Sequence, residues 1–340
     1  SLEYWVKEYN IDGFRFDLVG IFDYANVDEW AKYLNTTYPD RNLMLYGEPW
    51  NGYATDSRES YRVRLNTVGQ LKDAHFGVFN PKYRDAIRGQ GDTAYCDSGD
   101  CFMFNQSPDT WKIQVGSRGG IRYSNGTAVL STIWDPMFAS DPEQSINYVS
   151  AHDNYNLRDK IRMWASAYNV TDSGYLTRIQ EFANGVVLTS QGIPFIYGGD
   201  EFMRTKQLDK NSYKSSDSIN AFDWSLKSTN SAVFNYYKDV IAMRKAHPGF
   251  RMNTWDEVTN NVTTTLPSSG VVINTISAGN NGDSWSKIIV IMNSANNYTY
   301  TLPSGTWYVA MQKSVPVTST VTASGSVVAE GTAVTVLYQK

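Results

Sequence analysis

The sequence predicts an α/β protein, in which part of a (β/α)8 TIM barrel is followed by an all-β sandwich domain. Residues 1–250 alternate short apolar runs with longer amphipathic or polar stretches, which is typical of β-α units around a parallel sheet. Residues 251–340 are instead rich in Thr, Ser, Val, Asn and Gly, with alternating runs at 287–292 and 332–338. We therefore assign 1–250 to the C-terminal part of a (β/α)8 barrel and 251–340 to the β-sandwich.

Each barrel strand is expected where a short apolar run ends in polar or turn-forming residues. Helices are expected at 26–36 and 175–190, and a short helix at 83–89 closes on a glycine. The expected strands are, in chain order, 12–17, 42–47, 74–79, 146–151 and 193–197. A complete barrel has eight strands in about 250 residues. We expect the five to be strands 4–8, so that strands 1–3 lie outside this chain.

The composition excludes several classes of partner. A net charge of -4 with 19% charged residues provides neither a basic face for nucleic acid nor a polybasic segment for a membrane surface. Aromatic residues make up 14% of the chain, including ten Trp and 23 Tyr, and aromatic rings stack well on the apolar faces of sugars. The composition therefore favours a neutral partner and leans toward carbohydrate.

Cysteines and acidic clusters leave two questions open. Cys96 and Cys101 lack metal-ligand spacing, and a loop disulfide and two free thiols are both compatible with the sequence. Asp92, Asp97 and Asp100 lie near each other but without the spacing of a recognisable calcium loop, so a structural calcium ion remains open. No apolar stretch approaches the roughly 20 residues that span a bilayer. No signal peptide opens the chain, which begins with Ser rather than Met.

An aspartate ends the first expected strand. Because alternate residues of a strand share a face, Arg15 and Asp17 should be neighbours. An arginine beside an aspartate favours the ionised carboxylate, which is the form that a nucleophile needs. The alternative is a purely structural ion pair inside the barrel.

Two further acidic residues also follow apolar runs. Glu48 stands between Gly47 and a Pro-Trp pair, and an aromatic wall near a carboxyl raises its pKa, which would keep Glu48 protonated as a general acid. The alternative is a solvated glutamate at a turn. Asp153 follows His152, and this pair either binds sugar hydroxyls or is structural. None of the three motifs is decisive alone.

The order of the three motifs resembles the clan of retaining α-amylase-type glycoside hydrolases. That resemblance implies that Asp17 is the nucleophile, Glu48 the general acid/base and Asp153 a transition-state stabiliser, with Arg15 and His152 in supporting roles. A retaining mechanism places the two reacting carboxyl groups about 5–5.5 Å apart, and adjacent strand ends suit that spacing.

Within this clan the chain is similar to the type I pullulanases. The resemblance implies hydrolysis of α-1,6-glucosidic links in pullulan, amylopectin and limit dextrins through a covalent glucosyl-aspartate intermediate. The alternatives are another clan member that acts on α-1,4-glucans, a non-catalytic α-glucan-binding fragment, and a carbohydrate-binding role for the sandwich. The segments that carry the resemblance are 12–18, 46–50, 77–89, 148–154, 191–198 and the run from 204 to 224.

The resemblance also implies further substrate-binding residues. Trp50 would line the cleft around the scissile bond, and Asn154 would bind glucose hydroxyls. Residues in the loop after the last strand would either contact the sugar or order the loop: Arg204, Lys206, Asn211 and Asp217. His75 and His247 match no motif, and we expect structural roles for them.

The same family sets the remaining expectations. Two carboxyl groups supply the chemistry, so no metal or organic cofactor is required. The partner is an α-glucan, with no nucleic acid and no membrane, and the protein is expected to be a monomer once the upstream part of the chain is present. Low charge and abundant Ser, Thr, Asn and Tyr favour a secreted or cell-surface bacterial enzyme, with a cytoplasmic location as the alternative. Because strands 1–3 and the family's upstream signature are missing, this chain alone should lack debranching activity and expose an unpaired strand edge.

Overall fold

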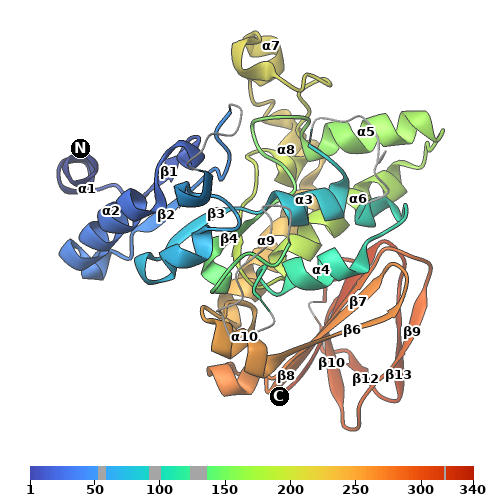
Figure 1. Ribbon diagram of the computed structural model, residues 1–340. Coiled ribbons are helices and arrows are strands. Elements are labelled where there is room, and N and C mark those ends of the chain that lie inside the picture. The colour runs from blue at the N-terminus through green and yellow to red at the C-terminus, as the bar shows by residue number, and fades with distance from the viewer. Residues whose placement is uncertain (53–58, 92–100, 123–135, 318) are drawn as a thin grey trace.

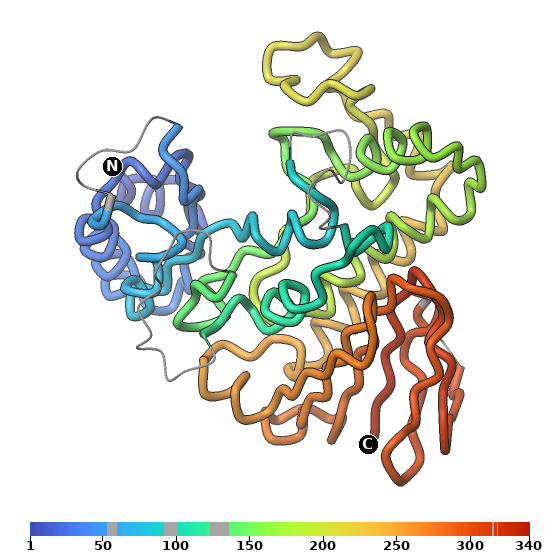
Figure 2. Tube along the Cα trace, turned by 45° about the vertical axis from the view of Figure 1, so that its right-hand side comes forward, coloured from blue at the N-terminus to red at the C-terminus, as the bar shows by residue number. Residues whose placement is uncertain are grey.

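The computed structural model describes residues 1–52, 59–91, 101–122, 136–317 and 319–340. Figure 1 shows two regions: helices around a parallel sheet, and an antiparallel β region coloured orange to red. In Figure 2 the β region lies against the helices of the middle of the chain, on the side away from the N-terminal helices.

The parallel sheet has five strands whose spatial order follows the chain order. All neighbouring pairs are parallel, so the carboxyl ends of the strands meet at one edge. The first and last strands each pair with a single neighbour within the described part of the chain. The strands are β1 (Gly13–Phe16), β2 (Met44–Gly47), β3 (Phe76–Phe79), β4 (Ser145–Asn147) and β5 (Ile193–Pro194). All five expected strands are confirmed, although β4 and β5 end earlier because the chain leaves the sheet to form the site loops.

The described residues contain ten α-helices. The expected helices at 26–36, 83–89 and 175–190 are confirmed as α2, α3 and α6, with ends displaced by a few residues. None of the helices in the described ranges combines the length and the apolar character that a membrane crossing requires. The helices are α1 (Leu2–Tyr9), α2 (Tyr24–Thr37), α3 (Pro81–Arg88), α4 (Thr110–Ser117), α5 (Leu157–Ala167), α6 (Ser173–Leu188), α7 (Asp217–Asn220), α8 (Ser225–Thr229), α9 (Ser231–Ala246) and α10 (Trp255–Asn261).

Helix α3 starts directly after strand β3 because its sequence carries strong start and stop signals. The side chain of Asn80 accepts a hydrogen bond from the backbone N–H of Tyr83, and Pro81 occupies the first helical turn. Gly89 ends the helix with φ of 81°, a conformation that glycine adopts at little cost. The helix is thereby placed with its first turns at the carboxyl edge of the sheet.

The β region contains one large antiparallel sheet and a separate two-stranded ribbon formed by β9 and β13. One face of the large sheet packs on the ribbon, and the other packs on α4 and α6. The predicted all-β region at the C-terminal end is therefore confirmed. The strands are β6 (Val262–Ser268), β7 (Val271–Ile276), β8 (Lys287–Asn293), β9 (Tyr298–Thr301), β10 (Trp307–Gln312), β11 (Val315–Pro316), β12 (Thr322–Ala323), β13 (Ser326–Ala329) and β14 (Ala333–Gln339).

Strand β8 is buried on both sides. Its residues Ile288, Val290 and Met292 belong to the core shared with the helices, whereas Ile289 and Ile291 belong to the core beneath the ribbon. Successive side chains of a strand point to opposite faces, so a continuous apolar run is what a strand covered on both faces needs.

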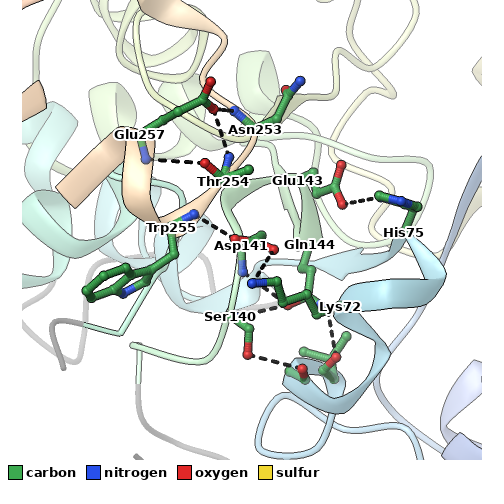
Figure 3. A network of polar contacts seen from close by, with 12 residues as sticks. Lys72, His75, Ser140, Asp141, Glu143, Gln144, Asn253, Thr254, Trp255 and Glu257 are labelled. Atoms are coloured by element: carbon green, nitrogen blue, oxygen red, sulfur yellow. Dashed lines mark hydrogen bonds and ion pairs between the residues drawn. The ribbon is translucent and has the colours of Figure 1, made fainter. Parts of the chain in front are cut away.

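A polar network joins the amino ends of β3 and β4 to the start of α10 (Figure 3). Asp141 accepts a hydrogen bond from the backbone N–H of Trp255 at 2.6 Å and lies 3.3 Å from the ammonium of Lys72. Nearby, His75 Nδ1 lies 2.7 Å from a carboxyl oxygen of Glu143. This network fastens the beginning of the β region to the base of the parallel sheet, at the end opposite to the strand-end carboxyl groups.

His247 contributes to the contact between the helical and β regions. Its Nδ1 lies 2.8 Å from Asp283, and its ring stacks on Trp285. With His75 in the polar network, both histidines that match no motif take part in structural contacts.

Candidate active site

A cavity of about 360 Å³ opens at the carboxyl edge of the parallel sheet. Its walls come from the ends of the strands and from the loops that follow them. Six of the sequence-predicted site residues line it: Arg15, Glu48, Trp50, His152, Asp153 and Asn154.

Glu48 is the buried carboxyl of this cavity. Its residue is only 3% exposed. The guanidinium of Arg15 donates to Oε1 of Glu48, and the backbone N–H of Leu18 donates to Oε2 at 2.9 Å. Burial raises the pKa of Glu48, and the Leu18 N–H and the Arg15 charge oppose this shift in part. The raised pKa agrees with the expectation for a general acid, which must carry its proton near neutral pH.

Asp17 lies at the mouth, one residue past β1. Its carboxylate is 3.7 Å from Nη1 of Arg15, and its side chain is 75% exposed. Asp17 does not line the cavity itself, but it is close enough to Glu48 that its hydrogen bond and negative charge raise the pKa of Glu48 further. The expected neighbour relation of Arg15 and Asp17 is present, yet the closer partner of Arg15 is Glu48.

His152, Asp153 and Asn154 form a turn after β4. Nε2 of His152 lies 3.5 Å from Oδ1 of Asp153, and both side chains are more than half exposed. Asn154 has φ of 62°, in the left-handed region that asparagine tolerates better than most residues. The turn therefore presents three polar side chains in succession to the cavity.

Aromatic rings form the apolar wall. Phe79 packs on Tyr148 and Phe195 with ring centroids 5.0 and 5.2 Å apart, and Trp50 lies 6.4 Å from Phe79. All four rings line the cavity. An apolar wall opposite polar groups suits a sugar ring, which has apolar faces and a polar rim.

Lys206 is enclosed beneath the turn and does not line the cavity. Its ammonium donates to the backbone carbonyl of His152 at 2.7 Å. Its own backbone N–H donates at 2.8 Å to Asp159, a fully buried residue in the first turn of α5. Burial lowers the pKa of Lys206. In this structure Lys206 supports the His152 turn from behind.

The other predicted loop residues also lie outside the cavity. Arg204 is buried, with its guanidinium 4.1 Å from the ring centre of Phe222 and 2.7 Å from the hydroxyl of Tyr197. Asn211 and Asp217 are exposed, and Asp217 begins α7. The structure does not bring these three residues to the cavity, so their contacts with a sugar stay a prediction.

Sequence reasoning missed part of the lining. Phe79, Arg84, Arg88, Tyr148 and Phe195 line the cavity, but no role was expected for any of them. Each follows or ends a strand, or lies in the helix directly after one. Proximity to a strand end was therefore the signal that could have found them.

The aspartates considered as calcium ligands and one of the two cysteines lie outside the described residues. Within the described residues, no group of three or more His, Cys, Asp or Glu side chains could hold a metal ion. Asp92, Asp97 and Asp100 lie outside the described residues. Cys101 is disulfide-bonded, and Cys96, the other cysteine of the sequence, lies outside the described residues.

Known proteins similar to this chain include several pullulanases. The pullulanase of Bacillus subtilis is 33% identical over 288 residues, which cover 85% of this chain and 37% of the relative. A solved pullulanase from Bacillus acidopullulyticus matches with a TM-score of 0.85 at 32% identity, over 99% of this chain and 39% of that one. A type I pullulanase from Bacillus subtilis, solved with maltose, matches with a TM-score of 0.85 at 30% identity, over 99% and 45%.

No protein-family model matches the chain. The chain spans 37% to 45% of the length of these three relatives.

Proposed function

The chain belongs to the pullulanase family of α-amylase-type glycoside hydrolases, and from this membership we propose that it cleaves α-1,6-glucosidic links in pullulan, amylopectin and limit dextrins. The substrate is a neutral α-glucan, and the reaction is debranching by hydrolysis with retention at the anomeric carbon. The cavity supports this substrate class because it combines an aromatic wall with a polar turn.

The proposed reaction has two steps. In the first, an oxygen of Asp17 bonds to the anomeric carbon while the bond from that carbon to the leaving oxygen breaks, and Glu48 gives its proton to that oxygen. In the second, ionised Glu48 takes a proton from water, whose oxygen attacks the anomeric carbon and displaces Asp17. Both carboxyl groups are then restored. Asp153, with His152, stabilises the charged transition state.

The observation that carries this proposal is the arrangement around Arg15. Its guanidinium donates to buried Glu48 and also lies 3.7 Å from exposed Asp17. The buried carboxyl has the raised pKa that an acid needs, whereas the exposed carboxyl faces solvent at the mouth. Environments this different support two different roles for two neighbouring carboxyl groups.

A hybrid enzyme tests the proposal, because the chain alone is expected to be inactive. Residues 1–340 replace the matching region of the Bacillus subtilis pullulanase, and the hybrid is incubated with pullulan. Maltotriose as the product is expected for α-1,6 cleavage. Products of α-1,4 cleavage would favour the alternative clan activity, and binding without any product would favour a non-catalytic fragment.

The nucleophile has its own test in the same hybrid. Asp17→Asn should abolish covalent labelling by a fluorinated glucosyl probe, whereas the unsubstituted hybrid should be labelled. Persistent labelling of the D17N hybrid would refute the role of Asp17. Glu48→Gln should lose hydrolysis while keeping the fold, because the amide has nearly the same shape but no acidic proton to transfer to the leaving oxygen.

The finer architecture belongs to the same proposal. We propose that β1 to β5 are strands 4–8 of a (β/α)8 barrel, that 1–250 form the catalytic part and that 251–340 form the sandwich domain. The chemistry requires no metal or organic cofactor. We also propose that the enzyme acts as a monomer outside the cell, which a disulfide-bonded Cys101 supports. Activity in the culture medium, eluting at the monomer size, would test both points.

A further inference from the structure

Helix α3 contributes a residue to the cavity that the proposed mechanism does not use. Arg84 lies in the second turn of α3, and its side chain is 13% exposed and lines the cavity. The segment 77–89 carries part of the family resemblance, yet none of its residues has a role in the two catalytic steps.

Two neighbours hold the guanidinium of Arg84 in one orientation. Nε of Arg84 donates to Asp85 at 2.7 Å, and Nη1 donates to the hydroxyl of Tyr148 at 2.9 Å. The guanidinium also lies 5.4 Å from the ring centre of Tyr148. Nη2 has no hydrogen-bond partner among the described residues, so its two N–H groups remain available. Because the guanidinium is already held in one orientation, its unused N–H donors can bind a ligand with little further loss of side-chain entropy.

A second unused donor lies beside Arg84. A side-chain carbon built on Gly91 would come 3.1 Å from the amide nitrogen of Asn154 and 3.2 Å from Nη1 of Arg84, so both groups flank this glycine. The amide of Asn154 makes no hydrogen bond to any described residue. Arg84 and Asn154 therefore lie close together in the wall of the cavity.

The electrostatics of this space favour a neutral ligand over an anion. Three arginines line the cavity, Arg15, Arg84 and Arg88, and three carboxyl groups offset them: Glu48 and Asp153 in the lining and Asp85 beside Arg84. The site therefore has no strong excess of positive charge. A vicinal pair of sugar hydroxyls offers acceptor oxygens without adding negative charge. The aromatic wall around Phe79 supplies the apolar surface that such a ring would cover.

We propose that Arg84, together with Asn154, binds hydroxyl groups of one glucose unit and so determines which glucan units the cavity accepts. The inference rests on the proposed function, because it assumes an α-glucan as the ligand. Arg84 acts here as a substrate-binding residue, and its hydrogen bonds to Asp85 and Tyr148 serve to orient it.

Calorimetric titration with maltotriose and its monodeoxy analogues tests the proposal. Arg84→Met should weaken maltotriose binding about tenfold or more, the size expected for losing charge-assisted hydrogen bonds. One deoxy analogue should bind the unsubstituted chain weakly, and R84M should bind that analogue and maltotriose equally. Arg178→Met, which removes an exposed arginine of α6, should leave every affinity unchanged.

A second variant separates binding from folding. Arg84→Lys keeps a positive charge beside Asp85 but lacks the planar guanidinium and its several donors. The R84K protein should therefore bind maltotriose weakly, while its melting temperature stays within a few degrees of that of the unsubstituted chain. Equal loss of affinity for all analogues in R84M, or unchanged affinity in both variants, would overturn the inference alone. Absence of maltotriose binding by the unsubstituted chain would also overturn the inference, whereas the proposed function would fail only if the hybrid released no maltotriose from pullulan.

Discussion

The ammonium of Lys206 donates a hydrogen bond to the backbone carbonyl of His152 at 2.7 Å, from beneath the turn that carries Asp153. The backbone N–H of Lys206 itself donates a hydrogen bond to the carboxylate of Asp159 at 2.8 Å. The loop after β5 and the first turn of α5 therefore support the polar turn of the cavity without touching a ligand there.

Replacing Lys206 by Met should loosen this turn. The His152 carbonyl would lose its charged donor in a partly buried contact, at a cost of about 1–3 kcal/mol in the free energy of unfolding. Chemical denaturation gives the stability, and the amide signal of Asp153 should shift and broaden in NMR spectra. Lys210→Met changes an exposed lysine of the same loop and should do neither. An unmoved Asp153 signal in K206M would contradict the supporting role.

Asp200 should make stability depend on pH. Burial raises its pKa to about 7, against the opposing charge of Arg88. Below the unfolded value near 3.8 both states bind the proton, and above it the unfolded chain loses the proton first. The stability that Asp200 contributes should therefore fall as pH rises toward 7, by about 1.4 kcal/mol per pH unit at most.

The comparison of wild type with Asp200→Asn isolates this effect. Urea denaturation at a series of pH values from 4 to 8 should show the wild type losing stability relative to D200N as the pH rises. Asp239→Asn, at an exposed position of α9, is the matched control. A stability difference between wild type and D200N that stays constant over the series would contradict the prediction.

The network in Figure 3 should be stabilising mainly through Asp141. Asp141→Ala leaves the Trp255 N–H without its acceptor, and we expect a loss of about 1–3 kcal/mol in the free energy of unfolding. Lys72→Ala removes only a half-exposed ion pair, which should cost less than about 1 kcal/mol. Equal losses in the two variants, measured by urea denaturation, would show that the ion pair rather than the backbone contact matters.

Gly116 should resist substitution because α4 packs closely on α3. A side-chain carbon at this position would lie 2.0 Å from Cδ2 of buried Tyr83, which cannot move aside freely. Gly116→Ala should therefore lower stability by about 1–3 kcal/mol. Gly198→Ala provides the comparison, since its nearest contact would be an ordinary 3.4 Å to Phe222. Similar melting temperatures for the two variants would refute this packing argument.

The strands and the buried acid were predictable from the sequence because local signals determine them. Each strand is a short apolar run bounded by polar residues, and Glu48 directly follows β2 and precedes a Pro-Trp pair. Its place at the cavity could be anticipated because the carboxyl ends of parallel strands meet at one edge of a sheet. Short-range patterns therefore gave the position of the cavity and its acid.

Contacts between distant segments were not predictable in the same way. Arg15 lies nearer in sequence to Asp17, yet its closer partner is Glu48 on the next strand. Lys206 reaches His152 across 54 positions, and Arg84 reaches Tyr148 across 64. These partners follow from how the loops cross over the sheet, which no local pattern in a single sequence records.

Strand β8, covered on both faces, has a consequence for cooperativity. Its alternate side chains belong to two different cores, so neither core can lose its packing without exposing the same backbone. The helices and the β region should therefore unfold in one transition rather than as separable units. The amides of β8 should be among the last to exchange with deuterium, at the free energy of global unfolding. A strand that contributes no residue to the cavity wall would then couple the unfolding of the helices to that of the β region.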